Sequence, residues 1–147
     1  EVIECSVIWH DYILSAVVRK RKRIDLSLLK SRKLNVETEL NSFIDKFEKK
    51  EVAIWGAGHQ SLAVMSLAKL ENKIRYVVDS APFKQGKYTP ATHFPIVAPI
   101  ELVNNPVKAV IIIAASYSNE VARIMKNTYQ HIKYVVIVED TGLRVIS

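Results

Sequence analysis

Residues 52–61 read Val-Ala-Ile-Trp-Gly-Ala-Gly-His-Gln-Ser, and this stretch decides the fold. The run from Glu51 to Trp55 is short and mostly apolar, which is typical of a buried strand. It ends at Gly56, and from His59 to Leu70 the apolar side chains follow a helical spacing. A strand that passes through a tight glycine turn into a helix predicts an α/β architecture.

The alternation of strand and helix continues to the C-terminus. Three further apolar runs predict strands, over residues 73–79, 107–115 and 134–140. The second of these runs is apolar enough to form the buried centre of a sheet. Helices are predicted near 99–104 and over 118–129, the latter with Ser118 as its N-cap. The pattern predicts an α/β fold of the Rossmann-like type, with a doubly wound and mainly parallel sheet.

The segment before this unit contains two different patterns. Apolar side chains from Val36 to Phe47 repeat at helical spacing, and Asn35 is a suitable N-cap for that helix. Residues 1–33 instead contain two alternating or apolar runs joined by His10-Asp11, which predict a β-hairpin preceding the sheet. A two-stranded hairpin is marginally stable alone. This one resembles the final hairpin of many SAM-dependent methyltransferases, so we expect it to belong to a preceding domain.

Composition excludes several classes of protein. The chain has 147 residues, 49% of them hydrophobic, which is enough to bury a core without a disulfide or metal staple. Cys5 is the single cysteine, and no Cys/His spacing is typical of a zinc site. Apolar runs such as 109–115 are much shorter than the roughly 20 residues that span a bilayer. We expect a cytoplasmic protein with no metal site and no membrane contact.

The net charge of +6 comes mostly from one cluster, the five consecutive basic residues Arg19–Arg23. A single cluster without interleaved aromatic residues is not typical of a nucleic-acid interface. We therefore expect no nucleic-acid partner, and we interpret the cluster as a solvated linker.

The glycine turn resembles the fingerprint of dinucleotide-binding folds. Gly56 permits the tight turn, and Gly58 lets backbone amides approach an anionic ligand at the helix N-terminus. Ser61 replaces the third glycine of that fingerprint, and Asp79 ends the second strand, where an acidic residue commonly binds ribose hydroxyls. Alternatively, the glycines only shape the turn. The candidate ligand contacts here are Gly56, Ala57, Gly58, His59, Gln60 and Asp79.

Residues 76–99 read Tyr-Val-Val-Asp-Ser-Ala-Pro-Phe-Lys-Gln-Gly-Lys-Tyr-Thr-Pro-Ala-Thr-His-Phe-Pro-Ile-Val-Ala-Pro. This segment resembles the C-terminal domain of sugar C-methyltransferases. The family signature runs approximately Val-Val-Asp-x-x-Pro-x-Lys-Gln-Gly-x-Tyr-x-Pro-Gly-Thr-x-x-Pro-Ile, and the resemblance extends from about Leu34 to the C-terminus. This chain has Ala91 where the signature has glycine, and its first turn lacks a lysine that family members often carry. Phosphate contact at that turn would then depend on backbone amides, His59 and Gln60.

The resemblance implies a parent enzyme with three parts: a zinc-binding N-terminal region, a SAM-dependent methyltransferase domain, and this module. We then expect residues 1–33 to be the last hairpin and exit linker of the methyltransferase domain, and residues 34–147 to be a Rossmann-like substrate-binding domain. The substrate implied is a nucleotide-linked sugar, and the partner is the upstream domain of the same polypeptide. SAM would be bound by the parent enzyme and no cofactor by this fragment.

Two loops supply the other candidate substrate contacts. The proline-rich loop after the second strand offers lysines, a permissive glycine and hydroxyl groups, or it is only an ordered surface loop. After the third strand, the family has a Trp-Asn-x-x-Glu-Ile step, where this chain has Tyr117 and Asn119-Glu120-Val121. Glu120 would bind a ligand hydroxyl or only complement the helix dipole. The candidates from these loops are Lys84, Gly86, Tyr88, Thr89, Tyr117 and Glu120.

No nucleophile motif or pair of catalytic carboxylates is evident, so we assign no catalytic residue and expect the chain alone to catalyse no reaction. Two alternatives remain open. The chain could be a docking or oligomerisation module, with a possible homodimer, or an NAD(P)-binding oxidoreductase domain suggested by Gly56, Gly58 and Asp79.

Overall fold

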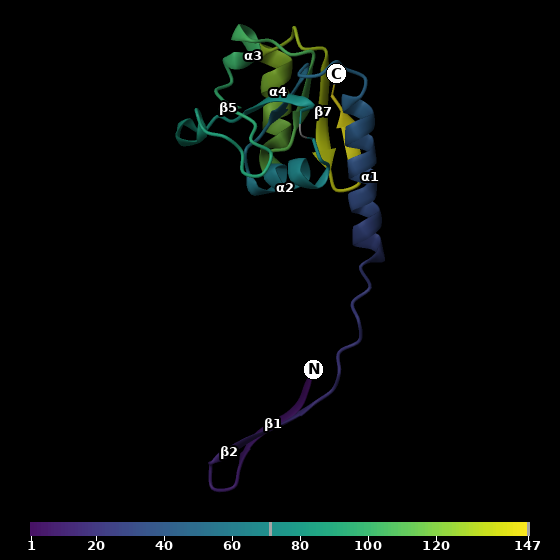
Figure 1. Ribbon diagram of the computed structural model, residues 1–147, viewed down its shortest axis with the longest axis vertical. Helices are drawn as coiled ribbons and strands as arrows, with labels where there is room; N and C mark the ends of the chain where they lie inside the picture. The colour runs from purple at the N-terminus through teal and green to yellow at the C-terminus, as the bar shows by residue number, and fades with distance from the viewer. Residues whose placement is uncertain (71, 147) are drawn as a thin grey trace.

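A mainly parallel six-stranded sheet forms the centre of the part of the chain that follows the hairpin. The computed structural model describes residues 1–70 and 72–146. The strand order is β5-β4-β3-β6-β7-β8, and only the β7–β8 pair is antiparallel (Figure 1). The strands are β3 (Val52–Trp55), β4 (Ile74–Val78), β5 (Ile96–Val97), β6 (Ala109–Ile112), β7 (Tyr134–Glu139) and β8 (Gly142–Val145). The predicted Rossmann-like α/β fold is confirmed.

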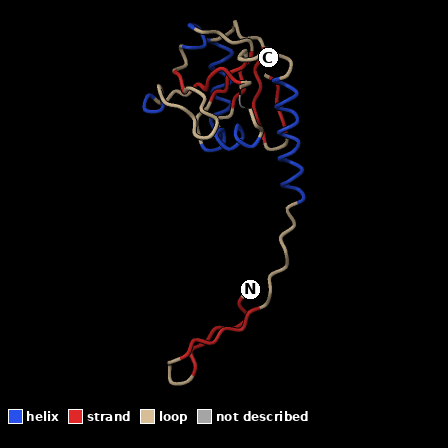
Figure 2. The backbone as a smooth tube through the Cα atoms, viewed as in Figure 1, coloured by secondary structure: helices blue, strands red, loops and turns tan. Residues whose placement is uncertain are grey.

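Helices cover both faces of this sheet (Figure 2). They are α1 (Ser27–Ile44), α2 (His59–Leu67), α3 (Glu101–Asn104) and α4 (Ser118–Thr128). Because successive strand residues point to opposite faces, Ile54 of β3 packs in the core under α1 and α2, and Trp55 packs in the core under α4. Both central strands, β3 and β6, are buried along their whole length. This explains why each reads as an uninterrupted apolar run.

The helix α1 begins at Ser27, eight positions before the predicted N-cap. Residues 27–34 contain mainly leucine, lysine and arginine, which are good helix formers, so the helix continues upstream of its core-facing part. Asn35 is therefore not an N-cap. Its side chain instead donates hydrogen bonds to the Thr141 carbonyl (2.6 Å) and to Glu39 (2.9 Å). The expected division at residues 33–34 falls within this continuous helix, and the division into two domains stays a prediction.

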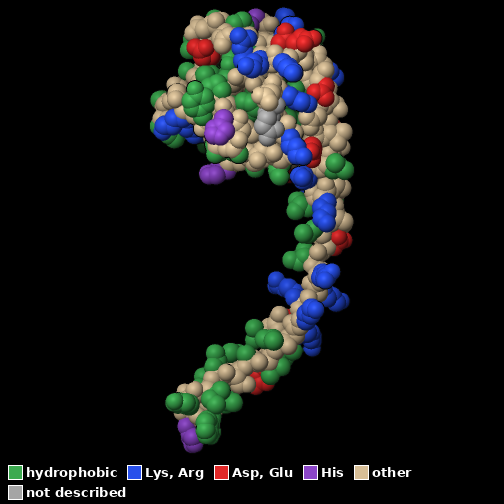
Figure 3. Space-filling view, in the orientation of Figure 1, with side chains coloured by type: hydrophobic (Ala, Val, Ile, Leu, Met, Phe, Trp, Pro, Cys, Tyr) green, Lys and Arg blue, Asp and Glu red, His purple; other side chains and the backbone are tan. Residues whose placement is uncertain are grey.

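The N-terminal hairpin is formed as predicted. Strands β1 (Val2–Ile8) and β2 (Ile13–Val18) pair antiparallel, and the turn between them holds Trp9, His10 and Asp11 at positive φ. In Figure 1 the hairpin lies apart from the six-stranded sheet, beyond the extended segment 19–26. Figure 3 shows the Lys and Arg side chains gathered along this segment and the apolar side chains exposed on the hairpin.

Some local features differ from the sequence predictions. Ser118 is the first residue of α4 and not its N-cap, and its hydroxyl accepts a hydrogen bond from the Ala114 amide (3.1 Å). The sequence did not indicate the short strands β5 and β8, whereas the short helix after Pro99 is present as α3. Within residues 1–70 and 72–146, no helix is long and apolar enough to cross a bilayer, and no three His, Cys, Asp or Glu side chains cluster as metal ligands would.

Candidate functional site

A cleft of about 610 Å³ opens at the carboxyl ends of β3, β4 and β6. In the sheet, β4 lies next to β3 on one side and β6 lies next to it on the other. The strand order therefore reverses at β3, and the cleft lies at this point. Open α/β sheets bind their ligands at such a point. The cleft is lined by Trp55, Gly56, Gly58, His59, Gln60, Asp79, Ser80, Lys84, Ile113, Ala114, Ala115, Tyr117, Glu120, Val121 and Ile124; for brevity we call it the switch-point cleft.

The two glycines of the first turn have different structural roles. Gly56 has φ +127° and donates its amide to the Val78 carbonyl (2.8 Å), and a Cβ there would overlap the carbonyl oxygen of Ile113. The fold therefore requires glycine at this position. Gly58 has an ordinary φ of −93°, is exposed, and has nothing within 4 Å of where a Cβ would lie. The fold does not require glycine at position 58, and the space in front of it is open.

The N-terminus of α2 lies at the same turn. Its first intrahelical hydrogen bond runs from the Leu62 amide to the Gly58 carbonyl (3.0 Å), and Gly58 offers no side chain as a cap. The amides of the first helical turn therefore have no intrahelical acceptor. The aligned peptide dipoles also make this end of the helix partly positive, which favours an anion.

Asp79 joins the glycine turn to the proline-rich loop. Its Oδ2 atom accepts hydrogen bonds from the Ala57 amide (2.8 Å) and from Lys84 Nζ (2.9 Å), and its Oδ1 atom accepts one from the Ala81 amide (2.9 Å). Its carbonyl oxygen accepts a fourth from Gln85 Nε2 (3.0 Å). Both carboxylate oxygens are thus engaged within the protein, which differs from the ribose-binding role expected from the sequence position alone.

The ionisation of Asp79 follows from these contacts. Burial by itself raises the pKa of the Asp79 carboxyl, and the hydrogen bonds from Ala81, Lys84 and Ala57 more than offset it, so the pKa lies below its ordinary value. Asp79 is only 8% exposed, and its charge is paired with that of Lys84. Lys84 also lies over the ring of Phe83, with its Nζ atom 5.9 Å from the ring centroid. The ammonium group thus reaches the cleft from a fixed position.

Tyr117 and Glu120 form the opposite wall. Tyr117 ends the short 3-10 helix η2 (Ala115–Tyr117) after β6, and Glu120 lies in the first turn of α4. The Tyr117 side chain is 67% exposed beside the apolar side chains of Val121 and Ile124. Glu120 is exposed and forms no salt bridge with any residue that the structure describes.

Eight of the twelve predicted contacts line the switch-point cleft: Gly56, Gly58, His59, Gln60, Asp79, Lys84, Tyr117 and Glu120. Ala57 lies behind the turn, where its amide bonds Asp79. Gly86 and Tyr88 line a separate depression beside β5. Thr89 is buried, and its hydroxyl accepts a hydrogen bond from the Phe94 amide (2.9 Å) and bonds the Thr92 hydroxyl (2.8 Å), so it holds the loop together. No described contact tests whether any of these residues binds a ligand.

Sequence reasoning missed the apolar part of this cleft as a ligand surface. Trp55, Ile113, Val121 and Ile124 were expected only in strands or on the inner face of a helix. Trp55 ends β3, Ile113 directly follows β6, and Val121 and Ile124 belong to the first two turns of α4, so these side chains lie at the carboxyl edge of the sheet. That position on the element is the signal that could have identified them.

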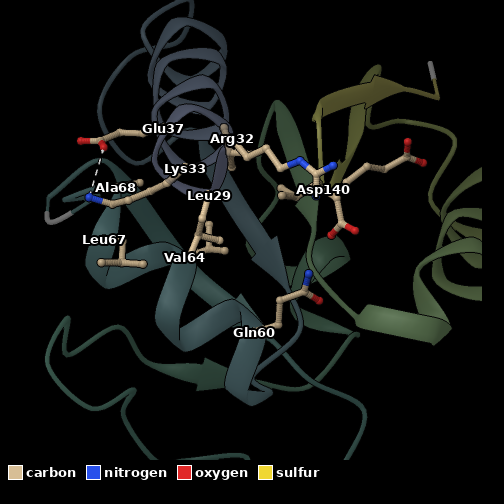
Figure 4. Close-up of a pocket in the computed structure, with 12 residues that line it drawn as sticks. Leu29, Arg32, Lys33, Glu37, Gln60, Val64, Leu67, Ala68 and Asp140 are labelled. Carbon is tan, nitrogen blue, oxygen red and sulfur yellow. Dashed lines mark ion pairs between the residues drawn. The ribbon is translucent and has the colours of Figure 1, made fainter. Parts of the chain in front are cut away.

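A second hollow lies between α1 and α2 (Figure 4). This groove of about 450 Å³ has an apolar floor that includes Leu29, Val64 and Leu67, and charged side chains at its rim. In Figure 4, Gln60 projects near the end of this groove, and the same residue lines the switch-point cleft. We call this feature the α1–α2 groove.

Comparisons with known proteins identify the fold and the family. The structure is similar to the crystal structure of UDP-D-quinovosamine 4-dehydrogenase from Vibrio fischeri, with a TM-score of 0.53 and 17% identity over 68% of this chain and 95% of that one. At this identity the likeness shows the fold alone. A search of curated proteins found no match. The profile of the C-methyltransferase C-terminal domain family matches residues 27–138, which include the glycine turn and the segment 76–99. The chain therefore belongs to the C-methyltransferase C-terminal domain family, as its resemblance predicted.

Proposed function

We propose that this chain binds a nucleotide-linked sugar and orients it for a SAM-dependent methyltransferase domain that precedes it in the parent enzyme. The observation that carries this proposal is the open turn at Gly58, where unpaired helix amides face the switch-point cleft. Lys84 adds a cation to the same end of the cleft. Backbone amides at a helix N-terminus together with a nearby cation are a common arrangement for phosphate groups.

Family membership implies SAM for the parent enzyme, where it would supply the methyl group. The residues of this chain do not fit SAM themselves. A Rossmann-type site normally holds the ribose of its cofactor through an acidic side chain at the end of the second strand. Here three of the roughly four acceptor positions of that side chain, Asp79, are occupied by Ala57, Ala81 and Lys84, so it is poorly suited to hold a cofactor ribose. The role proposed for this chain is therefore to hold the substrate.

The test compares two isosteric variants at the open glycine. Gly58→Asp places a carboxylate at the N-terminus of α2, and Gly58→Asn places a neutral amide of the same shape there. Both fit the backbone because φ is −93° and the space is empty, and both residues are good N-caps. Ligand-observed NMR with UDP-glucose and dTDP-glucose detects binding even at millimolar Kd, as expected when the preceding domain is missing.

We expect Gly58→Asp to weaken binding of both nucleotide sugars about ten-fold or more relative to Gly58→Asn, because the added charge repels the phosphates. Thermal unfolding should show that both variants are at least as stable as the wild type. Equal affinity of the two variants would refute the proposal that phosphates bind at this turn. In the parent enzyme, an unchanged KM for the sugar nucleotide in Gly58→Asp would also refute phosphate binding at this turn.

A docking role is the second candidate, and the α1–α2 groove favours it. The first half of α1 carries Leu28, Leu29 and Leu34 on its surface, and each is more than half exposed. The hairpin β1–β2 is also apolar and exposed, which fits the proposal that it completes a sheet of the upstream domain. Light scattering on Leu29→Glu tests for a homodimer: we expect a lower apparent mass than the wild type if the groove joins two copies.

An NAD(P)-binding oxidoreductase role has less support. Three of the roughly four acceptor positions of the Asp79 carboxylate are already occupied by Ala57, Ala81 and Lys84, which leaves little of it for the two hydroxyls of a ribose. Titration with NADH, followed by nicotinamide fluorescence, is the direct test, and saturable binding below millimolar concentration would favour this role over the first.

A further inference from the structure

The switch-point cleft has two chemically different ends. The end beside α2 and β4 is polar and contains the free amides of the first helical turn and the ammonium of Lys84. The end beside β6 and α4 is mainly apolar and is lined by Tyr117, Val121 and Ile124. A ligand that fills the cleft must therefore be anionic or hydroxylated at one end and flat and apolar at the other.

On the β4 side, the polar end has little hydrogen-bonding capacity left for a ribose–base unit. Dinucleotide-binding folds hold a nucleoside there through an acidic side chain. In this chain Asp79 accepts hydrogen bonds on both carboxylate oxygens and is nearly buried. The α2 amides and Lys84 remain, and these are phosphate-binding groups.

The apolar end offers an aromatic surface and an acceptor. Tyr117 lines the cleft and exposes two thirds of its side chain, so an aromatic surface is available there to a ligand. Glu120 projects from the next turn, with no salt bridge to the described residues. A flat heterocycle stacks on a tyrosine ring, and a carboxylate accepts a hydrogen bond from a ring N–H.

We infer that the nucleotide lies with its phosphates at the N-terminus of α2 and its base against the β6–α4 wall, stacked on Tyr117 and donating a ring N–H to Glu120. This inference rests on the proposed function and specifies the orientation of its ligand. The bases with a suitable ring N–H beside a carbonyl are uracil, thymine and guanine. Cytosine and adenine present an unprotonated ring nitrogen at that edge, which a carboxylate repels.

The experiment measures Kd values of this chain for UDP, dTDP, GDP, CDP, ADP and inorganic pyrophosphate by NMR titration. The variants are Tyr117→Ala and Glu120→Ala. Tyr88→Ala is the matched control, because Tyr88 is equally exposed (66%) but does not line the cleft. Pyrophosphate tests the phosphate end alone, and the five nucleotides separate the possible bases.

We expect Tyr117→Ala to weaken the best nucleotide about ten-fold, and to change the Kd of pyrophosphate less than two-fold. The Tyr88→Ala control should match the wild type for every ligand. Glu120→Ala should remove most of the preference for UDP, dTDP or GDP over CDP and ADP. Backbone amide signals of residues 116–120 should shift with the preferred nucleotide and not with pyrophosphate.

The outcomes distinguish this inference from the proposed function. If pyrophosphate and the nucleotides bind and Gly58→Asp weakens them, but Tyr117→Ala binds like the wild type, the base lies elsewhere and only the orientation is refuted. A preference for CDP or ADP that survives in Glu120→Ala would also refute it. If neither pyrophosphate nor any nucleotide binds at millimolar concentration, the proposed function itself fails, and the orientation fails with it.

Discussion

Replacing Asp79 with alanine tests whether this buried carboxylate holds the cleft together. The variant leaves the Ala57 amide without an acceptor in a buried position, which costs about 1–3 kcal/mol. The Ala81 amide and the Lys84 ammonium are partly exposed and can turn to water, so each adds less than about 1 kcal/mol. We expect Asp79→Ala to lower the free energy of unfolding by about 3 kcal/mol.

The assay is urea unfolding followed by far-UV circular dichroism at pH 7. The matched control is Asp45→Ala, because Asp45 also pairs with a lysine, Lys73, at 2.7 Å, but its side chain is 62% exposed. A surface pair of this kind contributes at most about 1 kcal/mol. The reasoning is refuted if Asp79→Ala destabilises the chain no more than Asp45→Ala does.

The effect of Asp79 also has a defined pH dependence. Because the pKa of the folded carboxyl lies below its ordinary value of about 4, the ionised form stabilises the fold at every pH above that value. The contribution is lost as the pH falls through the folded pKa. We expect the gap in unfolding free energy between the wild type and Asp79→Ala to be constant from pH 7 to about 5 and to narrow below about 4. A gap that widens in acid would contradict this assignment.

Three further predictions concern backbone positions. Gly56→Ala should destabilise the chain by several kcal/mol or prevent folding, since its Cβ would overlap the carbonyl oxygen of Ile113, whereas Gly58→Ala should change the melting temperature by only a few degrees. Gly142→Ala, at φ +152°, should lower the melting temperature strongly because its Cβ would overlap the Glu39 carboxylate; little change would show that α1 is not held to the β7–β8 turn. Ala91→Gly should stabilise the chain by about 0.5–1 kcal/mol in urea unfolding, because φ at this position is +63°, which disfavours alanine. A loss of stability in Ala91→Gly would argue against that backbone conformation.

The strands and helices of the sheet could be predicted because burial leaves a direct mark on the sequence. Strand β6 is buried on both faces and is therefore apolar at every position, and α4 carries Val121 and Met125 one turn apart on its buried face. The start of α1 could not be predicted in this way. Residues 27–34 face mostly water, so no apolar periodicity marks them, and their many charges suggest a linker instead.

The edge strand β8 was missed for a different reason. It has only four residues. Besides pairing with β7, it is held by hydrogen bonds with α1, which is distant in the sequence. The Glu39 carboxylate accepts the Leu143 amide (2.6 Å), and Asn35 donates to the Thr141 carbonyl. Contacts that join residues about a hundred positions apart leave no local pattern. The engagement of Asp79 by Ala57 was hidden in the same way, although both residues were candidates.

The residues of the family signature are not the residues that face the open side of the cleft. Asp79, Lys84 and Gln85 match the signature. Lys84 and Gln85 both donate hydrogen bonds to Asp79, and the Gly86 amide, at φ +75°, donates one to the Ile96 carbonyl of β5 (2.9 Å). The signature residues thus fix the loop against β4 and β5, which is a structural role.

The groups that face the switch-point cleft without a partner among residues 1–70 and 72–146 lie elsewhere. They are the first-turn amides of α2, the ring of Tyr117 and the carboxylate of Glu120. At the turn this chain departs from the family pattern, since it lacks the lysine often found there. A resemblance carried by residues 76–99 therefore predicts the frame of the site well. Under the proposed function, the choice of nucleotide should instead depend on Tyr117 and Glu120, and substitutions there should change specificity without changing the fold.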